Sequence, residues 1–395
     1  MTEKLFYENA YLKEFHAAVK RCVSAKKGKK EVFHVILDRT AFFPEGGGQY
    51  ADTGILGGRK VLDVQEIDEG ILHITDGPLT EGDTVEGCLD WTERHMKMQQ
   101  HTGEHIVSGI VNRRFGYQNV GFHLGSEDCT MDFNGEITKE QLREIETEAN
   151  RAVAANCEVL ILFPKPEELE TLQYRSKIEI EGQVRIVAIP GYDVCACCAP
   201  HVYRTGEIGM IKLTNVQHYK GGVRVTLLCG ARALADYRDK EQQIKEASAL
   251  LCAPEQEVYQ AVVRLKEEKD GLKQQLWELK HQLLREKLFP YLEWERKGEK
   301  APEFLWISEK DLTPEDNKYL LNQMLEKGVG ICIVVSENAE QFRYIAGSRT
   351  QDVRPVAKWF NIHFEGRGGG KEDMVQGACS LRPEEGTLST IFETE

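Results

Sequence analysis

The chain is organised around the run His101-Thr102-Gly103-Glu104-His105, which leads into the apolar stretch Ile106 to Val111. This pattern predicts a helix, and residues i and i+4 of a helix share one face. The two imidazoles therefore point the same way, which is half of a metal site. Further along the chain, Cys197 and His201 also stand four residues apart, beside a proline and small residues that suit a tight loop.

The two halves together offer the nitrogen and sulfur atoms that Zn2+ prefers as ligands. Spacing does not select the sulfur ligand, because Cys195 and Cys198 lie close to Cys197. The sequence therefore predicts a zinc site. Its expected ligands are His101, His105, Cys197 and His201.

The run His101 to His105 has a second interpretation, since it fits H-x-x-E-H, the inverted pattern of a zinc peptidase. In such an enzyme Glu104 is the general base, a carboxylate normally completes the ligand set, and one metal position stays open for water. A cysteine and a histidine close the set here instead. A metallopeptidase is kept as the alternative enzyme.

Length and composition limit the classes of protein to which the chain can belong. A chain of 395 residues predicts two to four domains, and 41% hydrophobic with 29% charged residues is typical of a soluble globular protein. No apolar run approaches the roughly 20 residues of a membrane span, and the N-terminal residues do not resemble a signal peptide, so we expect no membrane partner. Eleven scattered cysteines favour reduced thiols and a cytoplasmic location.

The net charge of −14 argues against a protein that simply coats nucleic acid. A nucleic-acid partner must therefore be met by local basic patches. Arg113 and Arg114, close to the histidine pair, form one such patch.

The order of patterns predicts a multidomain α+β protein. Residues 1–90 read as a small β-barrel with a glycine-rich loop, and residues 91–235 as an α+β domain that carries the zinc ligands. Residues 236–290 read as a helical hairpin or short coiled coil broken near Pro254, with a solvated linker as the alternative. Residues 300–395 read as a separate α/β domain.

Several motifs together resemble one family. They are the run Thr40 to Gln49, the pair His101 and His105, the run Gly121 to His123, and Cys197-x-x-x-His201. In this order they resemble the editing domain of alanyl-tRNA synthetase and, most of all, the freestanding alanyl-tRNA editing proteins of the AlaX type in their long form. The glycine-rich run Gly368 to Gly370 resembles the DHH-associated domain that closes those proteins.

The resemblance implies a zinc-dependent hydrolase that acts in trans on tRNA(Ala) mischarged with serine, or with glycine. It implies that the predicted ligands hold the zinc, although the family usually shows Cys-Gly-Gly-Thr-His where this chain has Cys197-Cys198-Ala199-Pro200-His201. It also implies that residues 300–395 bind tRNA or form a dimer. A tRNA-binding protein with a structural zinc and no turnover is the non-enzymatic alternative.

Individual roles follow from this interpretation. Glu104 is the candidate base, and Thr102 and His123 are the candidate contacts to the serine hydroxyl. An editing site with hydrogen-bond partners for that hydroxyl rejects alanine, because those partners would stay unpaired. We expect a homodimer through residues 236–290 or the C-terminal domain. The expected substrate-binding residues are Gly46, Gly47, Gly48, Gln49, Arg113, Gly368, Gly369 and Gly370.

Overall fold

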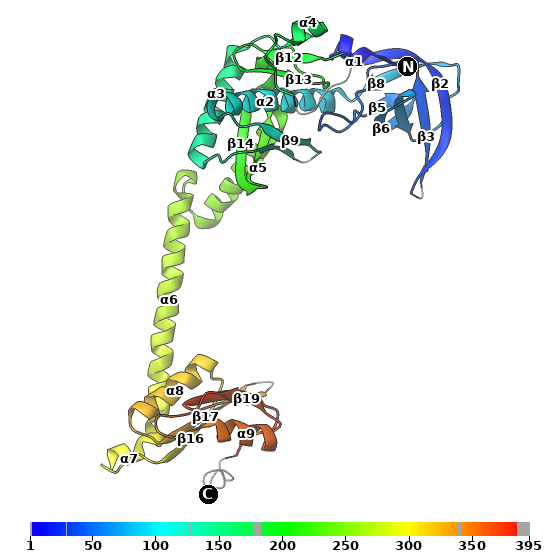
Figure 1. The fold of residues 1–395 in the computed structure, drawn as a ribbon. Coiled ribbons are helices and arrows are strands. Elements are labelled where there is room, and N and C mark those ends of the chain that lie inside the picture. Colours follow the sequence, from blue (N-terminus) through cyan, green and yellow to red (C-terminus); the bar gives the residue numbers. More distant parts are fainter. Residues whose placement is uncertain (1, 29, 127, 177–182, 339–340, 385–395) are drawn as a thin grey trace. The chain divides into compact units, whose positions relative to one another are not determined.

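The computed structural model describes residues 2–28, 30–126, 128–176, 183–338 and 341–384. Its chain divides into two compact units, residues 1–247 and 248–395, which are treated separately below. Helices and several sheets alternate through both units (Figure 1). The mixed α+β class predicted from the sequence is confirmed. Among these described residues, no helix is both long enough and apolar enough to cross a bilayer.

The first unit begins with a closed six-stranded barrel whose strands follow the order β2-β3-β7-β6-β5-β8. Its core is apolar and includes Phe15, Val35 and Leu56. Two short strands, β1 (Glu3–Lys4) and β4 (Arg39–Thr40), pair beside it, and α1 (Leu5–Glu8) follows β1. The barrel strands are β2 (Glu14–Lys27), β3 (Lys30–Leu37), β5 (Gly54–Leu56), β6 (Arg59–Ile67), β7 (Gly70–Thr75) and β8 (Thr84–Leu89).

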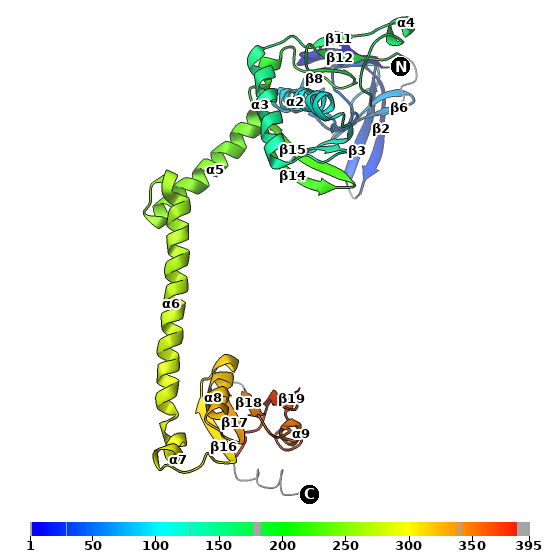
Figure 2. The same cartoon turned by 60° about the vertical axis from the view of Figure 1, so that its left-hand side comes forward.

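Helix α2 (Trp91–Phe115) crosses the centre of this unit, with β12 and β13 on one side and β14 and β15 on the other (Figures 1 and 2). The Asp90 side chain caps its start by accepting from the Glu93 N–H, and Gly116 ends it in the left-handed conformation. Because elements surround the helix, its residues from Lys97 to Val111 are buried, polar ones included.

Two sheets and a long helix surround α2. One sheet has the order β14-β15-β10-β9 and the other β11-β12-β13. The capping box expected at Thr138 and Gln141 is confirmed at the start of α3 (Lys139–Ala155). The other elements are β9 (Asn119–Leu124), β10 (Cys129–Phe133), β11 (Leu160–Leu162), α4 (Pro166–Leu169), β12 (Ile186–Ile189), β13 (Asp193–Ala196), β14 (Ile211–Tyr219), β15 (Gly222–Cys229) and α5 (Gly230–Leu251).

The second unit is a five-stranded sheet with the order β16-β17-β18-β20-β19. Helix α8 packs on one face with the C-terminal end of α6, and α9 packs on the other. The helix break expected near Pro254 is confirmed, since α5 ends before it and α6 begins after it. The elements are α6 (Val258–Lys287), α7 (Glu293–Arg296), β16 (Phe304–Lys310), α8 (Pro314–Glu326), β17 (Ile331–Asn338), β18 (Gln341–Ser348), α9 (Arg354–His363), β19 (Arg367–Gly370) and β20 (Met374–Cys379).

Candidate metal centre

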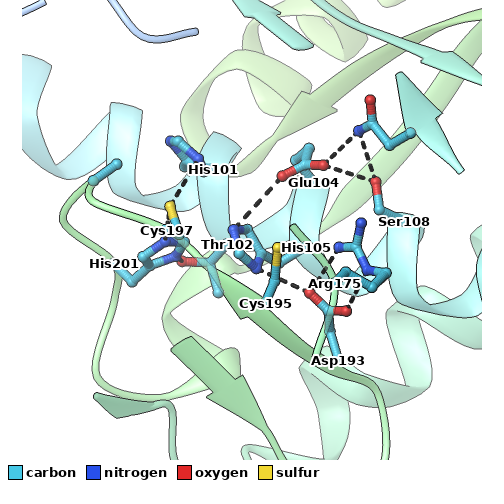
Figure 3. Close-up of polar contacts among 12 residues, drawn as sticks. His101, Thr102, Glu104, His105, Ser108, Arg175, Asp193, Cys195, Cys197 and His201 are labelled. Carbon is cyan, nitrogen blue, oxygen red and sulfur yellow. Dashed lines mark hydrogen bonds and ion pairs between the residues drawn. The ribbon is translucent and has the colours of Figure 1, made fainter. Parts of the chain in front are cut away.

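Helix α2 and the loop after β13 bring three histidines and one cysteine together (Figure 3). Cys197 Sγ lies 3.5 Å from His101 Nε2 and 3.4 Å from His201 Nε2. The donor atoms of all four residues lie within 4.8 Å of one another. Each histidine is only 2% exposed. The structure thus gathers the four ligands expected from the sequence: His101, His105, Cys197 and His201.

Each of the three imidazoles is held at its outer nitrogen, Nδ1, by a separate buried side chain. This leaves the Nε2 atoms directed at the cluster, which is the arrangement that outer partners give to metal-ligating histidines. The distances are 3.1 Å from His101 Nδ1 to Gln49 Oε1, 3.0 Å from His105 Nδ1 to Asp193 Oδ2, and 3.0 Å from His201 Nδ1 to Thr102 Oγ1.

The Asp193 carboxylate is itself fixed by Arg175, which donates from Nε and Nη2 at 2.7 and 2.8 Å. Burial alone would raise the pKa of Asp193, but the hydrogen bonds from His105 and Arg175 hold it below its ordinary value. The group therefore stays ionised beside His105. Sequence reasoning missed both residues, although Asp193 stands in the turn just before the cysteines.

The three neighbouring cysteines differ in the pKa of their thiols. Burial would raise the pKa of Cys197, but the imidazoles of His101 and His201 lower it well below its ordinary value. Burial raises the pKa of Cys195 and raises that of Cys198 to about 11. Of the three, Cys197 is therefore the cysteine whose surroundings favour the thiolate, while Cys195 stands with His105 and Asp193 in a second group of potential ligands.

The glycine-rich loop from Gly46 to Gln49 is a tight turn against this cluster. Gly46 and Gln49 exchange backbone hydrogen bonds, and the Leu124 N–H donates to the Gly48 carbonyl at 2.7 Å. Gly48 has a φ of +80°, and a Cβ there would overlap the backbone oxygen of Phe122. A Cβ on Gly47 would lie 3.4 Å from Cys198 Sγ. The close approach permitted by these glycines sets Gln49 against His101.

A buried ionic network ties the segment around this loop to α2. Asp52 Oδ2 accepts from Arg94 Nε and from the Phe43 N–H, both at 2.8 Å. Lys97 Nζ donates to the Ala51 carbonyl at 2.6 Å and lies 3.5 Å from Asp52 Oδ1. These bonds fasten residues on both sides of the glycine-rich loop to Arg94 and Lys97 of α2. They therefore keep Gln49 next to the histidines of the same helix. Sequence reasoning missed the network.

A cavity of about 650 Å³ opens beside the cluster. Arg185 lies in its wall and is buried; its Nη1 donates to the carbonyls of Cys197 and Ala199 at 2.7 and 2.9 Å. No described carboxylate pairs with this guanidinium, and its Nε has no hydrogen-bond partner there. The lining is Lys4, Tyr7, Gly47, Gly48, His101, His105, Phe122, Phe163, Ser176, Gln183, Arg185 and residues 195–198.

Glu104 is buried on the neighbouring side of α2 (Figure 3). Its Oε1 accepts from Ser108 Oγ at 2.7 Å and from Asn119 Nδ2 at 2.6 Å. Its Oε2 lies 3.8 Å from His105 Nε2, the nitrogen that faces the cluster. The carboxylate is therefore next to the metal-binding face but is not part of the cavity wall.

Neither of the two residues expected to contact a serine hydroxyl lines this cavity. The Thr102 hydroxyl is fully buried against His201 Nδ1 and does not line the cavity. His123 is exposed and lines a different cavity of about 730 Å³ with Gly46, Gly48 and Gln49. Side chains alternate along β9, so Phe122 faces inward, with its ring centroid 4.8 Å from that of His101, and His123 faces away.

Arg113 does not line the cavity beside the cluster, and the three expected glycines belong to the second unit. Arg113 lies eight positions after His105 on α2; its Nη1 donates to the Gly191 carbonyl at 2.7 Å, and it pairs with Glu148. The three glycines Gly368, Gly369 and Gly370 form most of β19, an exposed edge strand of the second unit.

Two protein families match parts of the chain. The family described as the threonyl and alanyl tRNA synthetase second additional domain matches residues 184–226, which contain the Cys197 and His201 half of the cluster. The family described as tRNA synthetases class II (A) matches residues 1–93.

Individual relatives match nearly the whole chain. It is 28% identical to the alanyl-tRNA editing protein AlaX-L of Pyrococcus horikoshii, a match that covers 98% of this chain and 96% of that protein. It is 31% identical to the alanine–tRNA ligase of Pyrococcus abyssi over 95% of this chain, but over only 42% of the ligase. The chain thus spans less than half the length of the ligases it matches. The resemblance expected from the motifs is confirmed.

Among solved structures, the C-Ala domain of alanyl-tRNA synthetase from Aquifex aeolicus matches 24% of this chain and 91% of that domain. The sequence identity is 15% and the TM-score is 0.21, a value too low to carry a structural argument.

Proposed function

We propose that this chain, which is similar along nearly its whole length to an AlaX-L alanyl-tRNA editing protein, is a hydrolase that deacylates tRNA(Ala) mischarged with serine, or with glycine. The observation that carries the proposal is the set of three imidazoles. Each is oriented by its own buried partner, and together with the Cys197 thiolate they stand beside a cavity.

The metal that fits the donor set is Zn2+, because three imidazole nitrogens and one thiolate are its usual ligands. In the proposal it is held by His101, His105, Cys197 and His201. When bound, it supplies a positive charge that polarises a carbonyl group or anchors a polar atom of the substrate. The outer partners Gln49, Asp193 and Thr102 keep the imidazoles in place.

The reaction itself asks little of the protein, since an aminoacyl ester is already a reactive acyl group. A water oxygen attacks the carbonyl carbon, the bond from that carbon to the ribose oxygen breaks, and the ribose oxygen takes up a proton. Glu104 is proposed to receive the proton from the water, because its Oε2 lies 3.8 Å from the inner nitrogen of His105. The Arg185 guanidinium is proposed to stabilise the negative charge that develops on the carbonyl oxygen.

Selection of serine over alanine requires hydrogen-bond partners for one hydroxyl group. Tyr7 and Arg185 in the cavity wall are proposed for this role. Thr102 is proposed to act indirectly, by orienting His201. Gly47 and Gly48 are proposed to contact the substrate in the cavity wall. The residues proposed to contact the tRNA elsewhere are Gly46, Gln49, Arg113, His123, Gly368, Gly369 and Gly370.

The proposal also assigns a role to each part of the chain. Residues 1–90 form the barrel domain, residues 91–235 the editing domain, residues 236–290 a helical linker, and residues 300–395 the DHH-associated domain that binds tRNA or a second copy. The proposed location is the cytoplasm.

The test is deacylation of Ser-, Gly- and Ala-tRNA(Ala) by the purified full chain, in parallel with casein as a peptidase substrate. We expect rapid loss of serine with alanine spared and casein intact. A Glu104→Gln variant should lose most of the rate while it keeps its zinc. Casein cleavage without deacylation would favour the metallopeptidase, and tRNA binding without turnover would favour a structural zinc.

A further inference from the structure

A second pocket lies in the unit formed by residues 248–395 and is independent of the metal centre. Its volume is about 380 Å³, which falls within the range of roughly 300–1,000 Å³ typical of small-ligand sites. Strands β18 and β20 form its floor and the start of α8 forms a wall. The lining is Pro314, Asn317, Gln341, Arg343, Tyr344, Ile345, Gln376, Gly377 and Ala378, which includes one basic side chain and no acidic one.

Within the described part of the chain, three lining residues of this pocket have a buried polar atom without a hydrogen-bond partner: Asn317, Arg343 and Tyr344. Asn317 is only 3% exposed; its Nδ2 donates to Ser336 Oγ at 2.8 Å, but its Oδ1 is buried with no partner. The Nε of Arg343 is also buried and unpartnered. A buried polar group without a partner carries a free-energy cost, so such groups beside a cavity indicate a missing ligand.

A second arginine stands on the same face of the sheet. Arg343 of β18 and Arg367 of β19 both lie directly opposite Ala378 of β20. Direct cross-strand neighbours share a face, so the two arginine side chains leave the same face of the sheet on either side of a small residue. Two residues further along, the cross-strand neighbours on this face are Ile345, Gln376 and Gly369. Gly369 has no side chain, so the surface next to the edge strand stays open.

Nothing described neutralises these two arginines. Across the residues with defined positions, neither Arg343 nor Arg367 forms an ion pair with a carboxylate. Of the two acidic residues in the first turn of α8, Asp316 is paired with Lys280 and hydrogen-bonded by Thr313, and neither Asp316 nor Glu315 lines the pocket. Arg343 lines the pocket together with Pro314 and Asn317 at the start of α8, and Arg367 stands on the same face of the sheet. In a chain with a net charge of −14, this unpaired positive charge near a helix N-terminus suits an anion.

We propose that this pocket binds a phosphate-bearing ligand of nucleotide size. Arg343 and Arg367 hold the phosphate, because a guanidinium presents paired donors that match phosphate oxygens. The amide of Asn317 and that of Gln376 meet the polar groups of the remainder. The phosphate comes from a free nucleotide or from an RNA chain, and the chemistry of the contact is the same for both.

The experiment is a calorimetric titration of the full chain with AMP, with adenosine as the probe that lacks the phosphate. We expect AMP to bind and adenosine to bind at least about tenfold more weakly, since hydrogen bonds to charged groups contribute most. Arg343→Gln and Asn317→Ala should each weaken AMP binding by a similar factor. Arg349→Gln, an exposed arginine of the same unit outside the pocket, should bind AMP like the wild type.

An Arg343→Lys variant guards against a folding defect, because it keeps the charge and should keep part of the affinity. Competition with uncharged tRNA(Ala) then separates the two sources: displacement of AMP assigns the phosphate to RNA, and no displacement assigns it to a free nucleotide. The proposal is overturned if AMP does not bind, if adenosine binds as tightly, or if Arg343→Gln leaves AMP binding unchanged. None of these outcomes depends on deacylation.

Discussion

In the four-residue cluster, the orientation of His105 depends on a carboxylate that lies 88 residues further along the chain. Asp193 accepts from His105 Nδ1 while Arg175 holds both of its oxygens. Outer partners of this kind fix the ring of a ligating histidine and make its inner nitrogen more basic. The ligand strength of His105 therefore depends on the ionised state of Asp193.

Asp193→Asn should weaken zinc binding by about 10- to 100-fold, because the ring loses the partner that fixes it. Competition with a chelator measures this directly. Asp132→Asn is the matched control, since Asp132 is also held through both oxygens by an arginine, Arg224, but lies outside the cluster. Equal zinc affinity in the two variants would contradict the assigned role of Asp193.

The buried histidine of the barrel, His73, makes the folding stability of the barrel depend on pH. Burial lowers the pKa of His73 on β7 from 6.5 to about 4, despite a hydrogen bond to the Val35 carbonyl. As the pH falls, the unfolded chain therefore binds a proton before the folded chain does. The contribution of the neutral ring is full above pH 6.5 and is lost as the pH falls to 4, which amounts to about 3 kcal/mol.

His73→Gln should remove this dependence while its amide still pairs with the Thr40 hydroxyl, which lies 2.8 Å from His73 Nε2. Urea unfolding across this pH range is the measurement. The wild type should lose stability relative to the variant as the pH falls. Parallel curves would show that the buried ring does not govern the acid stability of the barrel.

Among the elements, the glycine-rich loop is the one most sensitive to a single methyl group. Gly48→Ala adds a Cβ that overlaps the Phe122 backbone at a φ of +80°. The loop must then move away from His101 and Gln49 must lose its contact. We expect the variant to lose most of its deacylase rate, measured on Ser-tRNA(Ala).

Gly58→Ala is the control for this change. Gly58 has a similar φ of +75°, but a Cβ there meets nothing within 4 Å. The cost of a left-handed alanine, of order 1 to 3 kcal/mol, is thus common to both variants. The deacylase rate of Gly58→Ala should stay near the wild-type value. A similar loss in both would indicate backbone strain and not the position of the loop.

The sequence predicts each half of the four-residue cluster, because the i, i+4 spacing on α2 and in the Cys197 loop is local. It does not predict the outer partners: Gln49 and Asp193 reach their histidines only through the packing of the loop and of β13 against α2. The position of His123 outside the cavity beside the cluster could not be predicted for a related reason. Alternation along a strand says that Phe122 and His123 face opposite ways, but only the fold decides which of them faces the cluster.

At the scale of the whole molecule, α6 carries an apolar series that is exposed within its unit. The residues are spaced by three and four positions with a single interruption at Lys269, and each is 49–68% exposed. Such spacing is typical of a coiled-coil seam, and a polar residue within it specifies register. The series is Val262, Leu265, Leu272, Leu276, Leu279 and Leu283.

This series predicts that the full chain associates as a dimer through α6. Sedimentation equilibrium should give a dimer for the wild type and a monomer for Leu276→Asp, which places a charge in the seam. Gln274→Asp places the same charge on the opposite face of the helix and should remain dimeric. A wild-type chain that stays monomeric at every concentration would contradict the predicted dimer.

The central claim is that the four-residue cluster supports hydrolysis of a mischarged tRNA, and one measurement tests it most directly. Serine release from Ser-tRNA(Ala) is followed together with bound zinc for the wild type, for Cys197→Ala, and for Cys252→Ala, whose cysteine is exposed in the second unit. We predict that Cys197→Ala loses both zinc and serine release, while Cys252→Ala keeps both and alanine is spared throughout. Undiminished serine release by a zinc-free Cys197→Ala would contradict the claim.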